Sequence, residues 1–326
     1  MDRTLGRSQI PVSPLGLGCW AMGGNFTLDG LSDGWGEVDE RESVAGIHAA
    51  LDRGVNFFDT ADVYGTGHSE RVLGRALKGK RHEAVIATKF GYTYDETTKE
   101  VFTRYNVTPD YIRYACERSL QRLDTDYIDL YQIHVGGLRL DEVETVIDAL
   151  NGLRQEGLIR TYGWSTWDTA NAELFAERSE AAAIQHVLNV LSDDKEMLAL
   201  CERHGLASIN NTPLAMGLLS GKFNKDTRFS DQDVRGSGHD WVAYFKEGKA
   251  VPSFLAKLEA VREILTSEDR TLVQGALAWI WGRSRAAIPI PGFKTKKQAE
   301  ELIGAVASGP LTAGQMNEIE GILGSM

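Results

Sequence analysis

Short apolar runs alternate along the chain with longer segments whose apolar residues recur at helical spacing. Several of the short runs are apolar at neighbouring positions, as in Val55, Phe57 and Phe58. Such runs are typical of strands that are covered on both faces of a parallel sheet. The pattern predicts eight strands, over residues 15–20, 55–59, 84–89, 127–134, 158–164, 182–185, 206–211 and 287–290.

Helix signals mark the segments between these strands. Asp39 is a good N-cap residue, and Glu42, three positions later, completes a capping-box pattern. Gly54 is suited to end the helix that follows. A second helix is predicted to begin at Thr108, with Pro109 at its first helical position.

This alternation predicts an α/β fold, either a (β/α)8 barrel or a doubly wound parallel sheet. Residues 1–326 show no break in composition and no Pro/Ser-rich linker, which predicts a single domain. Only the polar segment 222–251, between the seventh strand and its helix, interrupts the rhythm. Long irregular connections are usually functional. We therefore expect a lid or substrate loop there, with a decorative insertion as the alternative.

Four reactive side chains fall at or just after the ends of predicted strands. Asp59, Lys89 and His134 end their strands, and Tyr64 lies in the loop after Asp59. In a parallel barrel these ends meet on one face. A nearby ammonium lowers the pKa of a phenol from its ordinary value near 10, and an aspartate can hold that ammonium in place. The sequence predicts that Tyr64 is a general acid aimed at a developing alkoxide, with His134 as a second polar contact.

Charge and composition narrow the possible partners. Lys and Arg number 35 against 46 Asp and Glu, a net charge of −11. This acidic balance argues against nucleic acid or an anionic membrane as a partner.

The chain contains no run of about 18 apolar residues, which is the length that a membrane span needs. Its N-terminus lacks the apolar stretch of a secretory signal. Three dispersed cysteines favour a reducing compartment, so we expect a cytoplasmic protein. We also expect a monomer. The scattered histidines, without an HxH pair, argue against a metallohydrolase barrel and predict no metal.

Five motifs, in order, resemble those of the aldo-keto reductase family. They are Asp-Thr-Ala-Asp-Val-Tyr-Gly-Thr-Gly-His-Ser-Glu at 59–70, Thr-Lys-Phe-Gly at 88–91, Gln-Ile-His at 132–134, Pro-Leu-Ala-Met-Gly-Leu-Leu-Ser-Gly-Lys at 213–222, and Ile-Pro-Gly at 290–292. The chain is most similar to the bacterial general-stress and sugar-related reductases of that family. The resemblance implies a (β/α)8 TIM barrel that binds NADP(H) at the C-terminal face of its strands.

The resemblance also implies a role for each catalytic candidate. Tyr64 matches the proton donor, Lys89 the residue that lowers its pKa, Asp59 the partner of the lysine, and His134 the histidine that orients the carbonyl. The implied activity is NADP(H)-dependent reduction of aldehydes, ketones or sugar carbonyls to alcohols. One alternative is an NAD(P)-dependent sugar or pyridoxal-type dehydrogenase that works mainly in the oxidative direction. Another is a cofactor-sensing binding protein, similar to the potassium-channel β subunits.

The implied cofactor residues follow the later strands. Ser165 and Gln185 match positions that hydrogen-bond the nicotinamide carboxamide, and the loop at 213–222 matches the one that wraps the pyrophosphate. Lys294 matches the base for the adenosine 2′-phosphate, which favours NADP over NAD. The full set is Ser165, Gln185, Pro213, Leu214, Gly217, Leu218, Gly221, Lys222, Gly292, Lys294, Gln298 and Glu301.

The chain departs from the pattern of many relatives in three places. Residues 211–212 are Asn-Thr in place of Tyr-Ser, so a tyrosine that would stack on the nicotinamide is missing. Thr166 and Leu302 each stand where asparagine is common. We expect Trp20 to replace part of the missing stack. The substrate pocket is predicted to be aromatic, with Trp20, Tyr92 and Trp241 in its lining.

Overall fold

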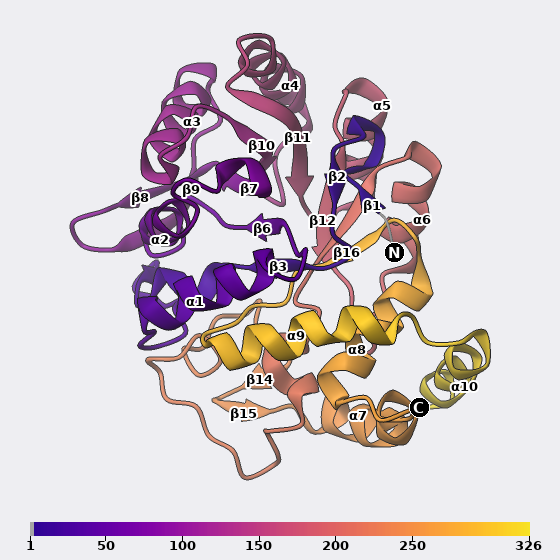
Figure 1. Cartoon of the computed structure of the whole chain (residues 1–326). Coiled ribbons are helices and arrows are strands. Elements are labelled where there is room, and N and C mark those ends of the chain that lie inside the picture. Colours follow the sequence, from indigo (N-terminus) through magenta and orange to yellow (C-terminus); the bar gives the residue numbers. More distant parts are fainter. Residues whose placement is uncertain (1–2) are drawn as a thin grey trace.

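A ring of eight parallel strands forms the centre of the computed structural model, which describes residues 3–326 (Figure 1). Each strand is hydrogen-bonded to its neighbour in the order of the chain. All eight predicted strands are present, with ends that differ from the predicted ranges by up to two residues. The strands are β3 (Gly16–Gly18), β6 (Phe57–Asp59), β7 (Val85–Phe90), β10 (Ile128–Ile133), β11 (Ile159–Ser165), β12 (Ala183–Val187), β13 (Ala207–Asn211) and β16 (Ala287–Pro289).

The ring closes where β3 meets the segment that follows β16. The Gly18 amide donates to the Pro291 carbonyl at 2.9 Å, and Gly18 forms a parallel bridge with Gly292. A Cβ atom at Gly18 would lie 2.7 Å from the Ile290 carbonyl oxygen, so this approach requires glycine. The predicted barrel is thereby confirmed, and the doubly wound alternative is wrong.

Helices cover the outside of the barrel (Figure 1). Asp39 and Thr108 cap their helices as predicted, since each side chain accepts a hydrogen bond from the first turn. The second half of the predicted capping box is wrong, because Glu42 accepts instead from the Lys296 amide at 2.9 Å. The helices are α1 (Glu40–Leu51), α2 (His68–Ala76), α3 (Pro109–Leu123), α4 (Leu140–Gln155), α5 (Thr169–Arg178), α6 (Lys195–His204), α7 (Pro252–Leu265), α8 (Leu272–Arg283), α9 (Lys296–Ser308) and α10 (Ala313–Gly324).

A short N-terminal hairpin covers the N-terminal end of the barrel. It consists of β1 (Arg3–Thr4) and β2 (Pro11–Val12), with the 3-10 turn η1 (Gly6–Ser8) between them. Its apolar side chains join those that point into the barrel, and Leu5 is fully buried. The cluster is Leu5, Ile10, Val12, Phe57, Val85, Ala87, Leu130, Ala183, Ala207, Ile209, Ile288 and Ile290. The interior at the N-terminal end of the barrel is therefore filled by apolar side chains.

Two additions lie over that end. A four-stranded sheet, which was not predicted, contains β5 (Leu31–Ser32), β4 (Thr27–Leu28), β9 (Glu100–Tyr105) and β8 (Tyr92–Asp95). Residues 222–251, here called the lid segment, are mostly irregular and contain only the hairpin of β14 (Phe245–Lys246) and β15 (Lys249–Ala250). The lid segment contacts the turn after β5, where the Val234 amide donates to the Gly34 carbonyl at 3.0 Å.

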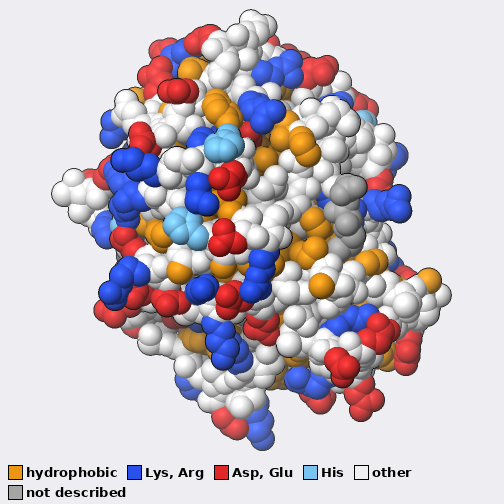
Figure 2. All heavy atoms as spheres, viewed as in Figure 1, with side chains coloured by type: hydrophobic (Ala, Val, Ile, Leu, Met, Phe, Trp, Pro, Cys, Tyr) orange, Lys and Arg blue, Asp and Glu red, His pale blue; other side chains and the backbone are white. Residues whose placement is uncertain are grey.

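The surface mixes charges of both signs. Figure 2 shows lysine and arginine side chains interspersed with aspartate and glutamate across the face it presents. None of the helices in residues 3–326 combines the length and the apolar character needed to cross a bilayer. Over the same residues, no group of three or more His, Cys, Asp or Glu side chains is arranged to hold a metal ion.

Candidate functional site

The ends of β6 and β7 bring a lysine, an aspartate and a tyrosine into contact. The Lys89 ammonium donates to Asp59 Oδ1 at 2.6 Å, to the Thr60 carbonyl at 2.8 Å and to the Tyr64 hydroxyl at 3.2 Å. Lys89 is fully buried, so its charge is separated from water and acts strongly on both partners. The geometry that was predicted for these three residues is present.

The second oxygen of Asp59 is held by two glutamines. Asp59 Oδ2 accepts from Gln185 Nε2 at 2.8 Å and from Gln132 Nε2 at 3.1 Å. A buried ion pair is stable only when its remaining hydrogen-bonding capacity is met, and these amides meet it. The nitrogen of Gln185 is thus used by Asp59, and its contact with a nicotinamide carboxamide stays a prediction.

Burial changes the acidity of Tyr64. Removal from water raises the pKa of the Tyr64 phenol above its usual value, Lys89 opposes this rise, and Asp59 adds to it. Lys89 thus acts in the predicted direction, but desolvation of the phenolate outweighs it and the pKa is raised overall. The pKa of Lys89 would fall through burial, but Asp59 raises it overall. Tyr64 is consequently a protonated donor at neutral pH.

His134 follows β10 and faces the same phenol. Its ring centroid is 5.9 Å from that of Tyr64, edge to face. Burial, and then the charge of Lys89, lower the pKa of His134 well below its usual value, so its imidazole is neutral. The Nδ1 atom of His134 is buried and has no hydrogen-bond partner within residues 3–326. Such an atom is costly unless a ligand or water meets it.

Aromatic rings line the approach to the phenol. Trp20 stacks on Tyr64 with centroids 5.9 Å apart, and Trp241 of the lid segment lies 6.0 Å from Trp20. On the other side, the Tyr92 ring meets His134 at 5.6 Å. The three aromatic residues predicted for the substrate pocket therefore surround the catalytic candidates, and contact with a substrate remains a prediction for each.

The predicted pyrophosphate loop follows β13 and is the 3-10 turn η4 (Ala215–Ser220). Within it Met216 and Gly217 have φ values of 53° and 92°, and Gly221 after it has 72°. Left-handed residues in a turn direct backbone N–H groups to one side, as phosphate-binding loops require. The side chain of Leu218 is fully buried, so only its backbone is available to a ligand.

Other predicted cofactor residues take part in contacts within the protein. Gln298 accepts from the Lys294 amide at 2.7 Å and caps α9, while Gly292 takes part in barrel closure. Thr166 donates to the Gly136 carbonyl at 2.6 Å, which anchors the loop after His134. Among the remaining residues of the set, Pro213 is buried. Ser165, Leu214 and Glu301 are partly exposed, and Lys222 is exposed.

Arg235, which the sequence analysis missed, lies beside the η4 loop. Its guanidinium stacks 3.8 Å from the Phe229 ring and pairs with Asp233 at 2.7 Å. A Cβ atom at Gly217 would lie 3.6 Å from Arg235 Nη1. The lid segment has no motif that marks this arginine, and its only signal is a cation next to a Gly-rich turn.

Lys294 lies close enough to Arg235 for the two charges to affect each other. The Lys294 ammonium donates to the Trp35 carbonyl. Burial lowers the pKa of Lys294, Asp233 opposes the change, and Arg235 adds to it. Arg235 is paired with Asp233, whereas Lys294 has no carboxylate in contact within the described residues, an arrangement that fits an additional anion such as a phosphate.

Residues 14–323 match the model of the Aldo/keto reductase family. The chain belongs to this family. It is 32% identical over 301 residues to the aldo-keto reductase YhdN of Bacillus subtilis, covering 90% of this chain and 85% of that protein. This member of the aldo/keto reductase family is therefore an oxidoreductase, and both the predicted family and the predicted barrel are confirmed.

Two further comparisons extend the likeness. The chain is 31% identical over 314 residues to the aldo-keto reductase yakc [NADP(+)] of Schizosaccharomyces pombe, covering 93% of this chain and 86% of that protein. The solved structure of glycerol dehydrogenase AKR11B4 from Gluconobacter oxydans superposes with a TM-score of 0.83 at 32% identity. That match covers 99% of this chain and 95% of the other.

Proposed function

We propose that this aldo/keto reductase converts a small aldehyde or ketone to an alcohol at the expense of NADPH, with Tyr64 as the proton donor. The observation that carries the proposal is the position of Lys89, 2.6 Å from Asp59 and 3.2 Å from the Tyr64 hydroxyl. In the balanced reaction, the carbonyl compound, NADPH and one proton give the alcohol and NADP⁺. Bound NADPH supplies the hydride for the carbonyl carbon.

The protein groups act on the carbonyl oxygen. Tyr64 donates a hydrogen bond to this oxygen and transfers its proton as negative charge develops there. Lys89 donates to the phenol oxygen and stabilises the phenolate that remains, while Asp59 keeps the ammonium in place. Neutral His134 presents a ring nitrogen that orients the carbonyl. Solvent then returns a proton to Tyr64.

The η4 loop, Arg235 and Lys294 support NADP(H) as the cofactor. The left-handed turn of the loop and Arg235 are suited to the pyrophosphate, and Lys294 is suited to the 2′-phosphate. The relative from Schizosaccharomyces pombe is named for NADP(+), which agrees with this assignment. Ser165 and Gln185 are proposed to contact the nicotinamide end, since both lie where strands end on the same face.

Oxidation of an alcohol is the second candidate direction. The relative from Gluconobacter oxydans is named a glycerol dehydrogenase, and oxidation would use the same groups in reverse. An oxidative reaction needs Tyr64 as a phenolate, whereas burial raises the pKa of that phenol. The protonated phenol that this predicts at neutral pH is the form that reduction uses. We also propose a cytoplasmic location, which is supported by the free and buried cysteines Cys19, Cys116 and Cys201. The proposed oligomeric state is a monomer.

Steady-state assays test this proposal. Purified protein is mixed with NADPH and a panel of aldehydes and ketones, and the loss of nicotinamide absorbance is followed. NADPH and NADH are compared at equal concentration, and the Kd of each is measured by quenching of tryptophan fluorescence. Turnover with several carbonyl compounds and tighter binding of NADPH is the expected result. Tight NADPH binding without turnover of any carbonyl would contradict catalysis and favour a cofactor-sensing protein.

A further inference from the structure

Asn189, in the turn after β12, is a fully buried amide whose polar atoms all have partners. Its Nδ2 atom donates to the Thr212 carbonyl at 2.9 Å and to the Tyr244 hydroxyl at 2.8 Å. Its Oδ1 atom accepts from the Leu191 amide at 3.0 Å. A side-chain amide has two donor hydrogens and one acceptor oxygen. These contacts use both ends of the amide and therefore fix its orientation.

The Thr212 carbonyl is the point from which the η4 loop leaves β13. The parallel pairing of β12 with β13 ends at Val187 and Asn211, so Asn189 lies just beyond the paired strands. The Thr212 carbonyl also accepts from the Ala215 amide at 3.0 Å, which closes the first turn of the loop. Asn189 thus holds an acceptor on which the shape of the loop depends.

This part of the chain is conformationally unfavourable without support. Thr212, Ala215 and Met216 have φ values of 52°, 48° and 53°, in the left-handed region. Residues with a Cβ atom seldom adopt this region, and they remain in it only where surrounding contacts impose it. The hydrogen bond from Asn189 is such a contact at the first of the three residues.

Tyr244 connects the lid segment to the same asparagine. Its buried hydroxyl accepts from Asn189 and donates to Ser192 Oγ at 3.0 Å. The Tyr244 ring packs on Phe254 of α7 with centroids 4.9 Å apart, and its carbonyl accepts from the Val251 amide at 3.0 Å. Tyr244 is therefore itself held in place and restricts Asn189 from the side of the lid segment.

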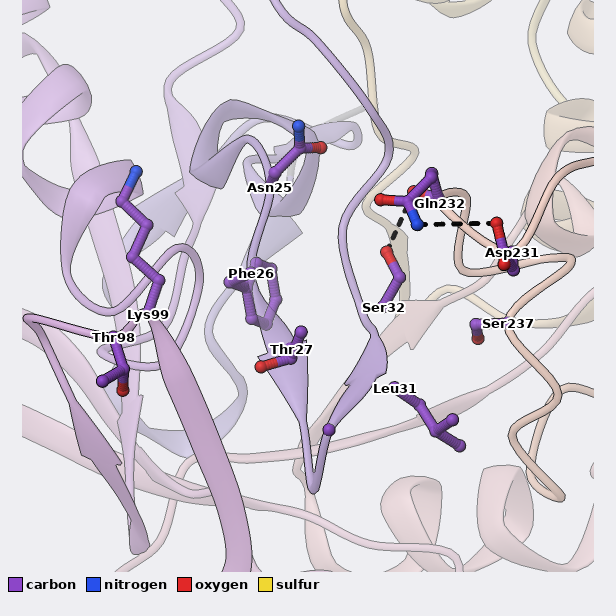
Figure 3. Close-up of a pocket in the computed structure, with 11 residues that line it drawn as sticks. Asn25, Phe26, Thr27, Leu31, Ser32, Thr98, Lys99, Asp231, Gln232 and Ser237 are labelled. Carbon is purple, nitrogen blue, oxygen red and sulfur yellow. Dashed lines mark hydrogen bonds between the residues drawn. The ribbon is translucent and has the colours of Figure 1, made fainter.

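The outer part of the lid segment is anchored elsewhere. Asp231, Gln232 and Ser237 line a cavity of about 390 Å³ together with the β4–β5 hairpin and the turn after β8 (Figure 3). Gln232 is exposed, and its carbonyl accepts from Ser32 Oγ at 2.9 Å. The inner and outer contacts of the lid segment can therefore be changed one at a time.

We propose that Asn189 is a positioning residue for the nucleotide: it holds the η4 loop in the shape that receives the pyrophosphate, and Tyr244 holds Asn189. This inference rests on the proposed binding of NADP(H) and assigns part of the affinity to two buried residues outside the loop. A preorganised loop loses less conformational freedom when its ligand binds, so affinity rises without a further contact. Loss of either residue should weaken every nucleotide that contains a pyrophosphate.

The test measures the Kd of NADPH, of NADH and of adenosine 2′-monophosphate, which has the 2′-phosphate but no pyrophosphate. We expect Asn189→Ala to raise the Kd of NADPH and NADH by about 10-fold, and Tyr244→Phe to raise both by about threefold. The Kd of the monophosphate should not change. The double variant should bind no more weakly than Asn189→Ala, because Tyr244 acts through Asn189. With NADPH saturating, the single-turnover rate should stay within about twofold of wild type, since neither residue acts on the carbonyl.

A second asparagine–tyrosine pair provides the matched control. The Tyr162 hydroxyl donates to Asn151 Oδ1 at 2.9 Å, where β11 packs on α4. Asn151→Ala and Tyr162→Phe remove the same groups far from η4 and should lower the melting temperature without raising any Kd. Gln232→Ala, at the outer cavity, should also leave each Kd unchanged.

The possible outcomes are distinguishable. If Asn189→Ala and Tyr244→Phe keep the wild-type Kd of NADPH, or if the control pair raises it by the same factor, the inference is overturned while the proposed function stands. An equal rise for the monophosphate also overturns it, because the effect is then not confined to the pyrophosphate. If Asn189→Ala does not fold, Tyr244→Phe decides alone.

Failure of the proposed function gives a different result. If wild type binds NADPH but reduces no carbonyl of the panel, the proposed reduction fails, and the Kd values still decide the inference. If wild type binds neither NADPH nor NADH, both fail together.

Discussion

The Lys89 ammonium lies 3.2 Å from the Tyr64 hydroxyl and is oriented toward it by a buried aspartate. This relationship links stability to catalysis, since the same cation compensates Asp59 and stabilises the phenolate that Tyr64 would become. Desolvation raises the pKa of the phenol in spite of Lys89. The lysine therefore limits the loss of acidity that burial causes.

Replacement of Lys89 should affect both properties. Lys89→Met leaves the Asp59 carboxylate without its cation, so we expect the free energy of unfolding to fall by about 3 kcal/mol. We expect kcat for reduction to fall by about 100-fold or more, because the phenolate loses its stabilising charge. Chemical unfolding and steady-state kinetics measure these changes. Lys195→Met removes an exposed ion pair with Glu320 and should alter neither quantity appreciably. A wild-type kcat in Lys89→Met would contradict the assigned role.

The neutral state of His134 predicts a loss of stability in acid. The native protein holds the pKa of His134 well below its usual value of about 6.5, which the unfolded chain regains. Below about pH 6.5 the unfolded state thus binds more protons, and the free energy of unfolding falls as pH falls, by up to about 1.4 kcal/mol per pH unit. Urea unfolding between pH 5 and 8 measures this slope. His134→Gln should make it shallower, and His82→Gln, at an exposed position, should not. Equal slopes in wild type and His134→Gln would refute the prediction.

Asp62 predicts the opposite dependence on pH. It is fully buried, neither carboxylate oxygen has a hydrogen-bond partner within the described chain, and burial, then Glu70, raise its pKa well above the usual value. Above about pH 4 the unfolded state releases a proton that the native state keeps, so Asp62 costs stability as pH rises, by about 1.4 kcal/mol per pH unit. Asp62→Asn should be more stable than wild type at pH 8, and the gain should shrink toward pH 4.

A second buried aspartate provides the control for Asp62. Asp129 is paired with Arg81 at 2.7 Å and Arg160 at 2.8 Å, so Asp129→Asn should destabilise the protein at pH 8. Thermal unfolding of both variants at pH 4.5 and 8 is the measurement. Destabilisation of Asp62→Asn at pH 8 would show that the native carboxyl group is ionised and paired, against the prediction.

Arg235 and Lys294 should act on different parts of the cofactor. Lys294→Ala should raise the Kd of NADPH by about 10- to 100-fold and that of NADH much less, because only NADPH carries the 2′-phosphate. Arg235→Ala should weaken both nucleotides by a similar factor, since both contain the pyrophosphate. Tryptophan fluorescence titration measures each Kd, with the exposed Lys297→Ala as the control. If Lys294→Ala weakened NADH as much as NADPH, its assignment to the 2′-phosphate would be wrong.

The barrel could be predicted because each strand is apolar on both faces. Runs such as Val85-Ile86-Ala87 are buried. Their continuous apolar character marks them as strands in the sequence, without knowledge of the neighbouring strands. The closure at Gly18 could not be predicted, since it depends on the approach of a backbone segment more than 270 positions away. Glu42 shows the same limit. Its local pattern favoured a capping box with Asp39, but its carboxylate accepts a hydrogen bond from the N-terminus of α9, which is distant in the sequence.

The catalytic candidates could be located for a related reason. Asp59 and Lys89 end strands, so the fold alone places them on one face. The direction of the Tyr64 pKa depends on how completely the phenol is buried, which no motif encodes. Arg235 lies in an irregular segment without periodicity, and its position follows from the packing of the lid segment against the turn after β5.

The central claim is that the Tyr64 hydroxyl gives its proton to the substrate. Tyr64→Phe removes only that hydroxyl, and its NADPH-loaded form can be mixed with an aldehyde in a single-turnover experiment that follows nicotinamide absorbance. We predict unchanged NADPH affinity and a single-turnover rate at least about 100-fold below that of wild type. A Tyr64→Phe protein that binds NADPH and oxidises it at the wild-type rate would contradict the account.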